Sequence, residues 1–507
     1  MAENAKSTSL TSRTFWLICA KSLAFAMGFA LPLLLVRRLS QTEFGLYKQA
    51  FLVIGTAASI LPLGFSMSAF YFLPREGERK GAIVFNIMLF NFFVGGLALV
   101  ALILRPGLIE TLFNSPALAP HATLIGVLIL IWVLSYFLEI SALANQEVGL
   151  STVFIIGAQL TKTALLLVAA INFASIRALL IAAIIQGSLQ IAALLVYLRS
   201  RFGQFWREFD WPVMRRQLTY ALPIGSAGLL YVVLTDLHNF FVSYRFGASA
   251  FAIYAIGCFS LPLVGIIGES VGPILIPNVS RLQKEGRTRE IVLVTASAMR
   301  KLSGIYFPLY ALLLVLGQEL ISFLFTAQYA ASWPIFAINL TLLPSLIIIA
   351  DPIIRAHAEH RYFLLKVRAA TIVVLFAALV FGARYFGLVG AISAMVGVTI
   401  VDRLIEAIKA WRIVNVTWRD IVLLKDVGKV AVATLAAGSI TAVVRLLVLG
   451  QRPFIVLSIC GVAFGCLYAT LVWLLGIVSP DEREAIRQKF ASMRRRISYR
   501  SAFEPLS

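Results

Sequence analysis

The stretch RFGASAFAIY, residues 245–254, decides the fold because the chain carries its pattern twice. The earlier copy reads RLSQTEFGLY, residues 38–47. The residues shared without a gap are an arginine, a phenylalanine and a tyrosine: Arg38, Phe44 and Tyr47 in the first copy, Arg245, Phe251 and Tyr254 in the second. Each copy lies between two long apolar runs, and the second run ends in a basic loop, PREGERK from Pro74 or SRLQKEGR from Ser280. Such a repeat predicts a membrane protein built from two similar halves.

The composition excludes a soluble protein, because 60% of the 507 residues are hydrophobic, 13% are charged and the mean hydropathy is +0.90. The apolar runs of about twenty residues fit helices that cross a hydrocarbon core of about 30 Å. The alternation typical of a membrane barrel is absent. The net charge of +20 is interleaved with the apolar runs, which favours topology signals over nucleic-acid binding. The four cysteines lie inside spans without a pairing or zinc-ligand pattern, so we expect no disulfide, metal or cofactor.

The apolar runs predict an all-α polytopic protein of about fourteen transmembrane helices. Residues 15–198 and 218–412 hold six runs each, which superpose after a shift of 207 residues, so we expect two six-helix bundles. Two additional helices lie in 413–478, a basic connector in 199–217, and polar or basic tails in 1–14 and 479–507. The first run is too long for a signal-peptide core and lacks a small-residue cleavage site. The expected spans are about 15–36, 46–73, 82–104, 121–142, 152–172, 176–198, 218–244, 250–278, 292–316, 334–354, 365–385, 388–410, 429–449 and 453–478.

Basic residues in the short loops predict the orientation. Lysines and arginines are about four times as frequent on the side that holds both tails and the connector as on the other side. Both termini are therefore expected in the cytoplasm. Because six helices is an even number, the two halves point the same way and form parallel repeats.

Five ionisable residues inside expected spans need an explanation, because such a group costs at least about 2.5–3.5 kcal/mol in hydrocarbon. They are Lys21, Lys162, Asp236, His238 and Glu269. One interpretation is a cavity in which the lysines bind an anionic cargo and Asp236, His238 and Glu269 respond to a coupling ion. The other is that these side chains form interhelical ion pairs or reach the membrane surface. Charges nearer the span ends are expected to anchor the helices at the interface: Glu139, Arg300, Lys301, Asp351, Asp402, Arg403, Glu406 and Arg445.

The chain resembles the polysaccharide transporter, or O-antigen flippase, family of the multidrug/oligosaccharidyl-lipid/polysaccharide flippase superfamily. The resemblance lies in LLLVRRLSQTEFGLYKQA, in YALPIGSAGLLYVVLTDLHNFFVSYRFGASAFAIYAIG and in the sequence PNVSR from Pro277, and it covers about residues 13–412. It implies two six-helix bundles around a central cavity, alternating access, and a cargo oligosaccharide on a polyprenyl diphosphate carrier. With its two additional spans the chain resembles the fourteen-helix arrangement of lipid II flippases and some exopolysaccharide transporters. The subfamily is therefore left open.

This resemblance gives the polar residues within spans two interpretations. Gln159, Gln186, Gln190, Asn86 and Asn91 either line a path for sugar hydroxyls or bond between helices. The two arginines of the repeat also have two interpretations. Arg38 and Arg245 either contact cargo on opposite sides of one outer opening or cap the ends of their own helices.

Other functions remain as alternatives. A drug/cation antiporter of the same superfamily is expected to have an acidic or apolar cavity, whereas Lys21 and Lys162 favour anionic cargo. A membrane glycosyltransferase, polymerase or ligase is disfavoured because no outer loop exceeds about twenty residues. A channel is disfavoured because no pore loop is visible. We expect contacts with membrane lipids, while the glycan, H⁺ or Na⁺ coupling, contact with polysaccharide polymerase machinery and the oligomeric state are left open.

The orientation can be tested with reporter fusions. A fusion after Ser115 should report outside and one after Gly286 should report inside, because the basic loops stay in the cytoplasm. The opposite result at both sites would reverse the orientation.

Overall fold

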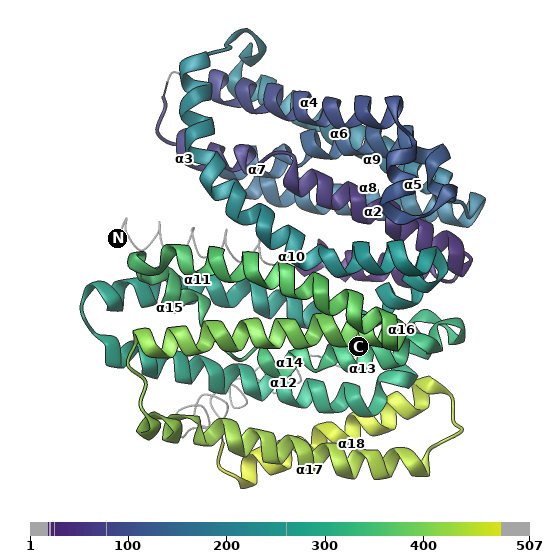
Figure 1. Cartoon of the computed structure of the whole chain (residues 1–507), viewed down its shortest axis with the longest axis vertical. Helices are drawn as coiled ribbons and strands as arrows, with labels where there is room; N and C mark the ends of the chain where they lie inside the picture. The colour runs from purple at the N-terminus through teal and green to yellow at the C-terminus, as the bar shows by residue number, and fades with distance from the viewer. Residues whose placement is uncertain (1–18, 20–21, 25, 78, 260, 478–507) are drawn as a thin grey trace, which may run out of the picture.

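The computed structural model describes residues 19, 22–24, 26–77, 79–259 and 261–477, which form helices and contain no strand. Figure 1 shows α2 to α9 in the upper body and α11 to α18 in the lower body, with α10 passing from one to the other. We call α2–α9 the first bundle and α11–α16 the second bundle. The all-α polytopic fold expected from the sequence is confirmed.

The helices of the first bundle follow a segment that ends at Leu35. They are α2 (Gln41–Ile60), α3 (Ala69–Phe72), α4 (Lys80–Leu104), α5 (Gly107–Phe113), α6 (Ala122–Ser135), α7 (Phe137–Ala144), α8 (Val148–Phe173) and α9 (Ile176–Phe202). Then come α10 (Trp211–Gly257), α11 (Pro262–Lys284), α12 (Thr288–Phe325), α13 (Trp333–Leu340), α14 (Leu342–Ser345), α15 (Asp351–Ala356) and α16 (Arg361–Ile413). The last two are α17 (Lys425–Leu447) and α18 (Pro453–Leu474).

Nine helical stretches of the described chain are long and apolar enough to cross a membrane, or ten if the bent pair 41–60 and 65–72 is one span. Two of the helices are longer than a single span requires: α16 has 53 residues and α10 has 47. At 1.5 Å per residue a straight helix of either length would measure about 70–80 Å, more than twice the hydrocarbon thickness. Glycines with left-handed φ angles break them, Gly247 at 78° and Gly387 at 59°. The total of fourteen spans stays a prediction.

Several helix boundaries differ from the sequence-based expectation. The expected span 46–73 bends by 43° after Ile60, where Leu63 and Gly64 adopt positive φ angles. The span 250–278 is interrupted between α10 and α11, and 334–354 is divided into α13, α14 and α15. The connector 199–217 is mostly helical: α9 continues to Phe202, and α10 begins after Asp210, whose side chain accepts a hydrogen bond from the Val213 amide. Hydropathy marks apolar runs but not the breaks within them.

The repeated motif contributes equivalent buried side chains in both halves. Phe44, Tyr47, Phe251 and Tyr254 are all at most 7% exposed. Phe44 and Tyr47 belong to an apolar cluster that includes residues of both bundles, whereas Phe251 and Tyr254 pack against α13 and α16. The aromatic positions of the repeat are therefore core positions.

The α2–α10 interface depends on small residues that let two backbones approach. A Cβ atom on Gly45 would lie 2.0 Å from the Ala248 carbonyl oxygen. At the other end of α2, a Cβ atom on Gly225 would lie 1.9 Å from the carbonyl oxygen of Leu63. Between these contacts the buried Gln49 amide donates to the Ser243 hydroxyl at 2.8 Å. Close packing of small residues is a usual way to hold membrane helices together.

The two bundles also meet around the first copy of the repeat, at the expected outer side. The Arg37 guanidinium donates to the carbonyl of Phe323, and the Gln328 amide donates to the carbonyl of Val36. The Gln41 amide donates to the Ser249 carbonyl, which joins the two copies of the repeat. The bundles are closed against each other at this end.

The other half of α10 belongs to the core of the first bundle. The buried Gln217 amide donates to the Ser68 hydroxyl at 3.2 Å, and Asn86 donates to the Gln217 side-chain oxygen at 3.3 Å. Tyr220 stacks on Tyr71 with ring centroids 4.5 Å apart. The sequence assigns 218–412 to the second bundle, yet the first turns of α10 make these contacts with the first bundle.

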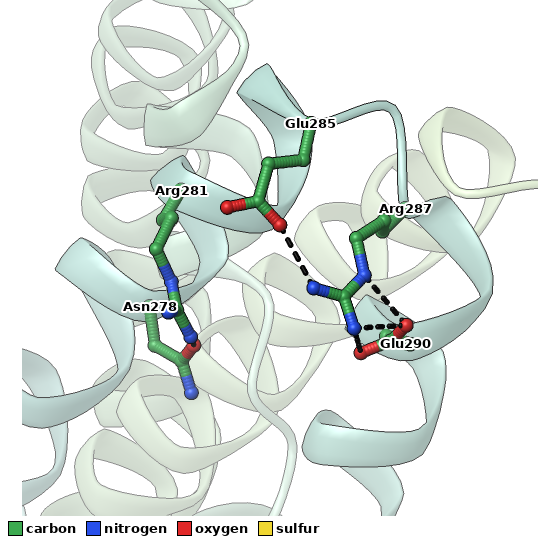
Figure 2. A network of polar contacts seen from close by, with 5 residues as sticks. All are labelled: Asn278, Arg281, Glu285, Arg287 and Glu290. Carbon is green, nitrogen blue, oxygen red and sulfur yellow. Dashed lines mark hydrogen bonds and ion pairs between the residues drawn. The ribbon is translucent and has the colours of Figure 1, made fainter.

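A network of charges fixes the turn between α11 and α12 (Figure 2). The Arg287 guanidinium donates to both oxygens of Glu290, at 2.6 and 2.7 Å, and to Glu285 at 2.9 Å. Arg281 donates to the Asn278 side chain one turn before the end of α11. Arg281, Glu285 and Arg287 belong to the basic loop that is expected in the cytoplasm.

An ion pair attaches α17 to the second bundle. Arg445, expected to anchor at the interface, lies 2.7 Å from Glu319 of α12, and both side chains are mostly buried. The second Glu319 carboxylate oxygen is buried without a hydrogen-bond partner among the described residues.

Arg445→Gln should therefore destabilise the protein by about 3 kcal/mol, because it leaves a buried carboxylate unpaired. Glu319→Gln combined with Arg445→Gln should recover much of this loss. Thermal unfolding of the purified protein in detergent measures both effects. An unchanged midpoint in the single variant would contradict this role of the pair.

Candidate functional site

A polar pocket of about 240 Å³ is lined by residues of the first bundle. It is lined by side chains of α6 to α9, and Ala24 adds a contact from the preceding helix. The polar and aromatic lining residues are Trp132, Ser135, Tyr136, Glu139, Phe154, Gln159, Lys162, Gln186 and Gln190. The pocket collects polar groups from four helices inside an apolar bundle.

Lys162 of α8 is the lysine of this pocket, as expected for a charge near the middle of its span. Its ammonium nitrogen lies 4.6 Å from the centroid of the Trp132 ring. No carboxylate of the described residues forms an ion pair with it. An aromatic face stabilises a desolvated cation by about 2 kcal/mol, less than the several kcal/mol that burying an ion costs. The ammonium therefore keeps the capacity to bind a polar or anionic partner.

The three glutamines of the pocket differ from the two asparagines in what they bond to. Gln186 donates to Gln190 at 2.8 Å within α9, and the Gln159 amide nitrogen would lie 3.7 Å from a Cβ atom on Gly28 of the preceding helix. Asn86 instead bonds to Gln217, and Asn91 donates to Ser66 and to the Val133 carbonyl. The asparagines hold helices together, whereas the glutamine amides line the cavity.

Asp236 and His238 lie on α10 and face different neighbours. The Thr56 hydroxyl of α2 donates to an Asp236 carboxylate oxygen at 2.5 Å, which places this carboxylate in the α2–α10 interface. The His238 Nδ1 atom lies 2.8 Å from the Tyr254 hydroxyl, so the histidine is hydrogen-bonded within α10 to the second copy of the repeat. The structure does not bring either residue to Lys162's pocket.

The remaining predicted site residues are either not described by the structure or exposed. Lys21 and the side chain of Glu269 lie outside the described residues. Arg38 and Arg245 are exposed and have no side-chain hydrogen bond to the described residues. Their copies of the repeat meet through Gln41 and Ser249, so both arginines flank the closed end of the interface.

Sequence reasoning missed Lys48, a half-buried lysine of α2 whose ammonium lies 5.5 Å from the Phe44 ring. Its position next to Tyr47 of the repeat, where the second copy has Ala255, is a signal that could have identified it.

Sequence reasoning also missed a polar group in the second bundle. Asp351 pairs with Arg355 at 2.6 Å and with Arg368 at 3.9 Å, and the Thr371 hydroxyl donates to Asp402 at 2.7 Å. These carboxylates, expected as separate interface anchors, have partners on the same and neighbouring helices.

Comparison with solved structures shows the fold. A lipid II flippase, MurJ, in an inward closed conformation matches with a TM-score of 0.68 at 14% identity, covering 90% of this chain and 98% of that one. An inward-facing multidrug resistance MATE family transporter of the MOP superfamily matches with a TM-score of 0.57 at 12% identity, covering 81% and 95%. The Vibrio cholerae MATE transporter VcmN in its bent form gives 0.52 at 16% identity, covering 81% and 97%.

Comparison of the sequence identifies the family. No curated protein matches the chain in sequence. The family model described as polysaccharide biosynthesis protein matches residues 34–334, which include both copies of the repeat, the pocket of Lys162 and the whole α2–α10 interface. The chain therefore belongs to this family of polysaccharide biosynthesis proteins.

Proposed function

We propose that this chain flips a lipid-diphosphate-linked oligosaccharide, or exports polysaccharide repeat units, across the bacterial inner membrane by alternating access. The observation that carries the proposal is the ammonium of Lys162, held in an amide-lined pocket within a bundle without a carboxylate partner among the described residues. An ionisable side chain inside an expected membrane span is a functional-site hypothesis by default. Family membership and the flippase-like fold support the same proposal.

Alternating access requires the bundles to separate at the end where they are now joined. The joining hydrogen bonds are few and go mostly to backbone carbonyls, as for Arg37 to Phe323 and Gln328 to Val36. A typical hydrogen bond contributes about 1 kcal/mol. Cargo binding would have to offset the loss of these hydrogen bonds and of the apolar contacts around Phe44 and Tyr47, a cluster that includes residues of both bundles.

Coupling to H⁺ or Na⁺ is part of the proposal, with Asp236 as the carboxylate that responds. Its hydrogen bond from Thr56 crosses the α2–α10 interface. A change in its charge would alter a contact between α2 of the first bundle and α10, the helix that passes between the two bundles. We also propose cytoplasmic termini, a polyprenyl diphosphate carrier and contact with polysaccharide polymerase machinery.

A drug/cation antiporter is the second candidate, favoured by the fold shared with MATE transporters. Lys162 disfavours a cationic drug in its pocket, because like charges repel most strongly where water is excluded.

Lys162→Gln should abolish glycan export while the protein still inserts and accumulates, because the amide keeps the polarity but loses the charge. Lys162→Arg should retain part of the activity. Surface glycan and protein level are measured in the same cells. Lys366→Gln removes the same charge at an exposed position of α16 and serves as the control. Normal export by Lys162→Gln would rule out its role in transport.

Asp236→Asn should keep the hydrogen bond from Thr56 but remove the charge. Flipping in liposomes should then lose its dependence on an imposed H⁺ or Na⁺ gradient, while the protein stays folded. Thr56→Val, which removes the hydroxyl and keeps the carboxylate, is the matched variant and should retain the dependence. A gradient dependence unchanged in Asp236→Asn would exclude this carboxylate from coupling.

A further inference from the structure

We propose that the pocket of Lys162 binds one sugar ring of the glycan rather than the diphosphate of the carrier. This proposal rests on the proposed function, since it assigns a part of the cargo to a part of the transporter.

The size of the pocket limits its ligand. Its volume of about 240 Å³ is below the range of about 300–1,000 Å³ that holds drug-sized ligands. An oligosaccharide with its carrier is far larger than a drug, so only one group of the cargo can enter. A single sugar ring is a group of suitable size.

The lining has the chemistry of sugar recognition. The amides of Gln159 and Gln190 each supply donors and an acceptor, which match the hydroxyls of a sugar in number and kind. Trp132, Tyr136 and Phe154 add aromatic surface to the lining, against which the apolar face of a sugar ring can pack. Gln186, which is only 3% exposed, donates to the Gln190 side-chain oxygen and fixes the direction of that amide. Gln186 is thus a positioning residue.

The charge of the lining disfavours the diphosphate. The described lining residues include one ammonium, Lys162, and one carboxylate, Glu139. A diphosphate carries more than one negative charge, and among the described lining residues only the Lys162 ammonium is there to offset its desolvation. The hydroxyls and amides of a sugar ring lose far less hydration, and each can be satisfied by the lining.

The location of the pocket determines which bundle a bound sugar moves with. All of its described lining residues lie in the first bundle or in the helix before it, and none comes from the second bundle. A sugar bound there stays with one bundle when the two move apart. The interface between the bundles is then left for the rest of the cargo.

The test measures binding of small probes to the purified full-length protein in lipid nanodiscs by saturation-transfer NMR. The probes are the methyl glycosides of a neutral hexose and of an N-acetylhexosamine, a uronic acid, and inorganic diphosphate. We expect at least one of the sugars to bind saturably and diphosphate not to displace it. Gln190→Met and Gln159→Met should each weaken binding about tenfold, since each removes hydrogen bonds worth about 1 kcal/mol.

Gln318→Met, at an exposed position of α12, is the control and should bind the sugar as the unmodified protein does. Equal thermal unfolding midpoints exclude misfolding of the pocket variants. Displacement of the sugar by diphosphate, equal sugar binding in all variants, or no sugar binding would each overturn the proposal. Flipping of a lipid-linked oligosaccharide by the unmodified protein in liposomes is assayed separately. Failure there, with sugar binding intact, would contradict the proposed function and not the pocket.

Discussion

The close approach of α2 and α10 is the contact on which the rest of the structure depends. Gly45 and Gly225 leave the opposing carbonyl oxygens room that no other residue type would leave. Because the backbones lie so close, the register of the two helices is fixed along their length. The same register pairs Gln49 with Ser243 and Thr56 with Asp236. The missing side chains of Gly45 and Gly225 let the two backbones approach, and this close packing therefore decides where the polar groups of the interface meet.

The fold was predictable because its main signals are local. Apolar runs and basic loops indicate spans, and the repeat indicates two similar halves; the burial of Phe44 and Phe251 agrees with their place in that repeat. The breaks inside spans were not predictable, because a residue such as Gly64 is as compatible with a membrane helix as with a bend. The role of α10 was also hidden, because Gln217 finds its partners Ser68 and Asn86 only in three dimensions.

The site was predictable in part, and for a similar reason. Lys162 stands out in the sequence because a lysine in the middle of an apolar run needs an explanation. The different roles of the glutamines and the asparagines cannot be read from the sequence, since both residue types carry the same amide group. It depends on which helix face meets a neighbour: Asn91 points at Ser66 and Val133, whereas Gln190 points into a cavity. The Trp132 ring beneath the ammonium was likewise invisible, because it comes from another helix.

The membership of α10 in both bodies has a mechanical consequence. Its first half is bonded to the first bundle through Gln217, and its second half packs in the second bundle through Val242. Under the proposed alternating access, the two bundles rock against each other and α10 is held by both, so it would act as a lever. A rotation of one bundle would then change the tilt of α10, and closing one end of the interface would be coupled to opening the other. Gly247, with its left-handed φ of 78°, ends this lever and lets the chain beyond it keep its place.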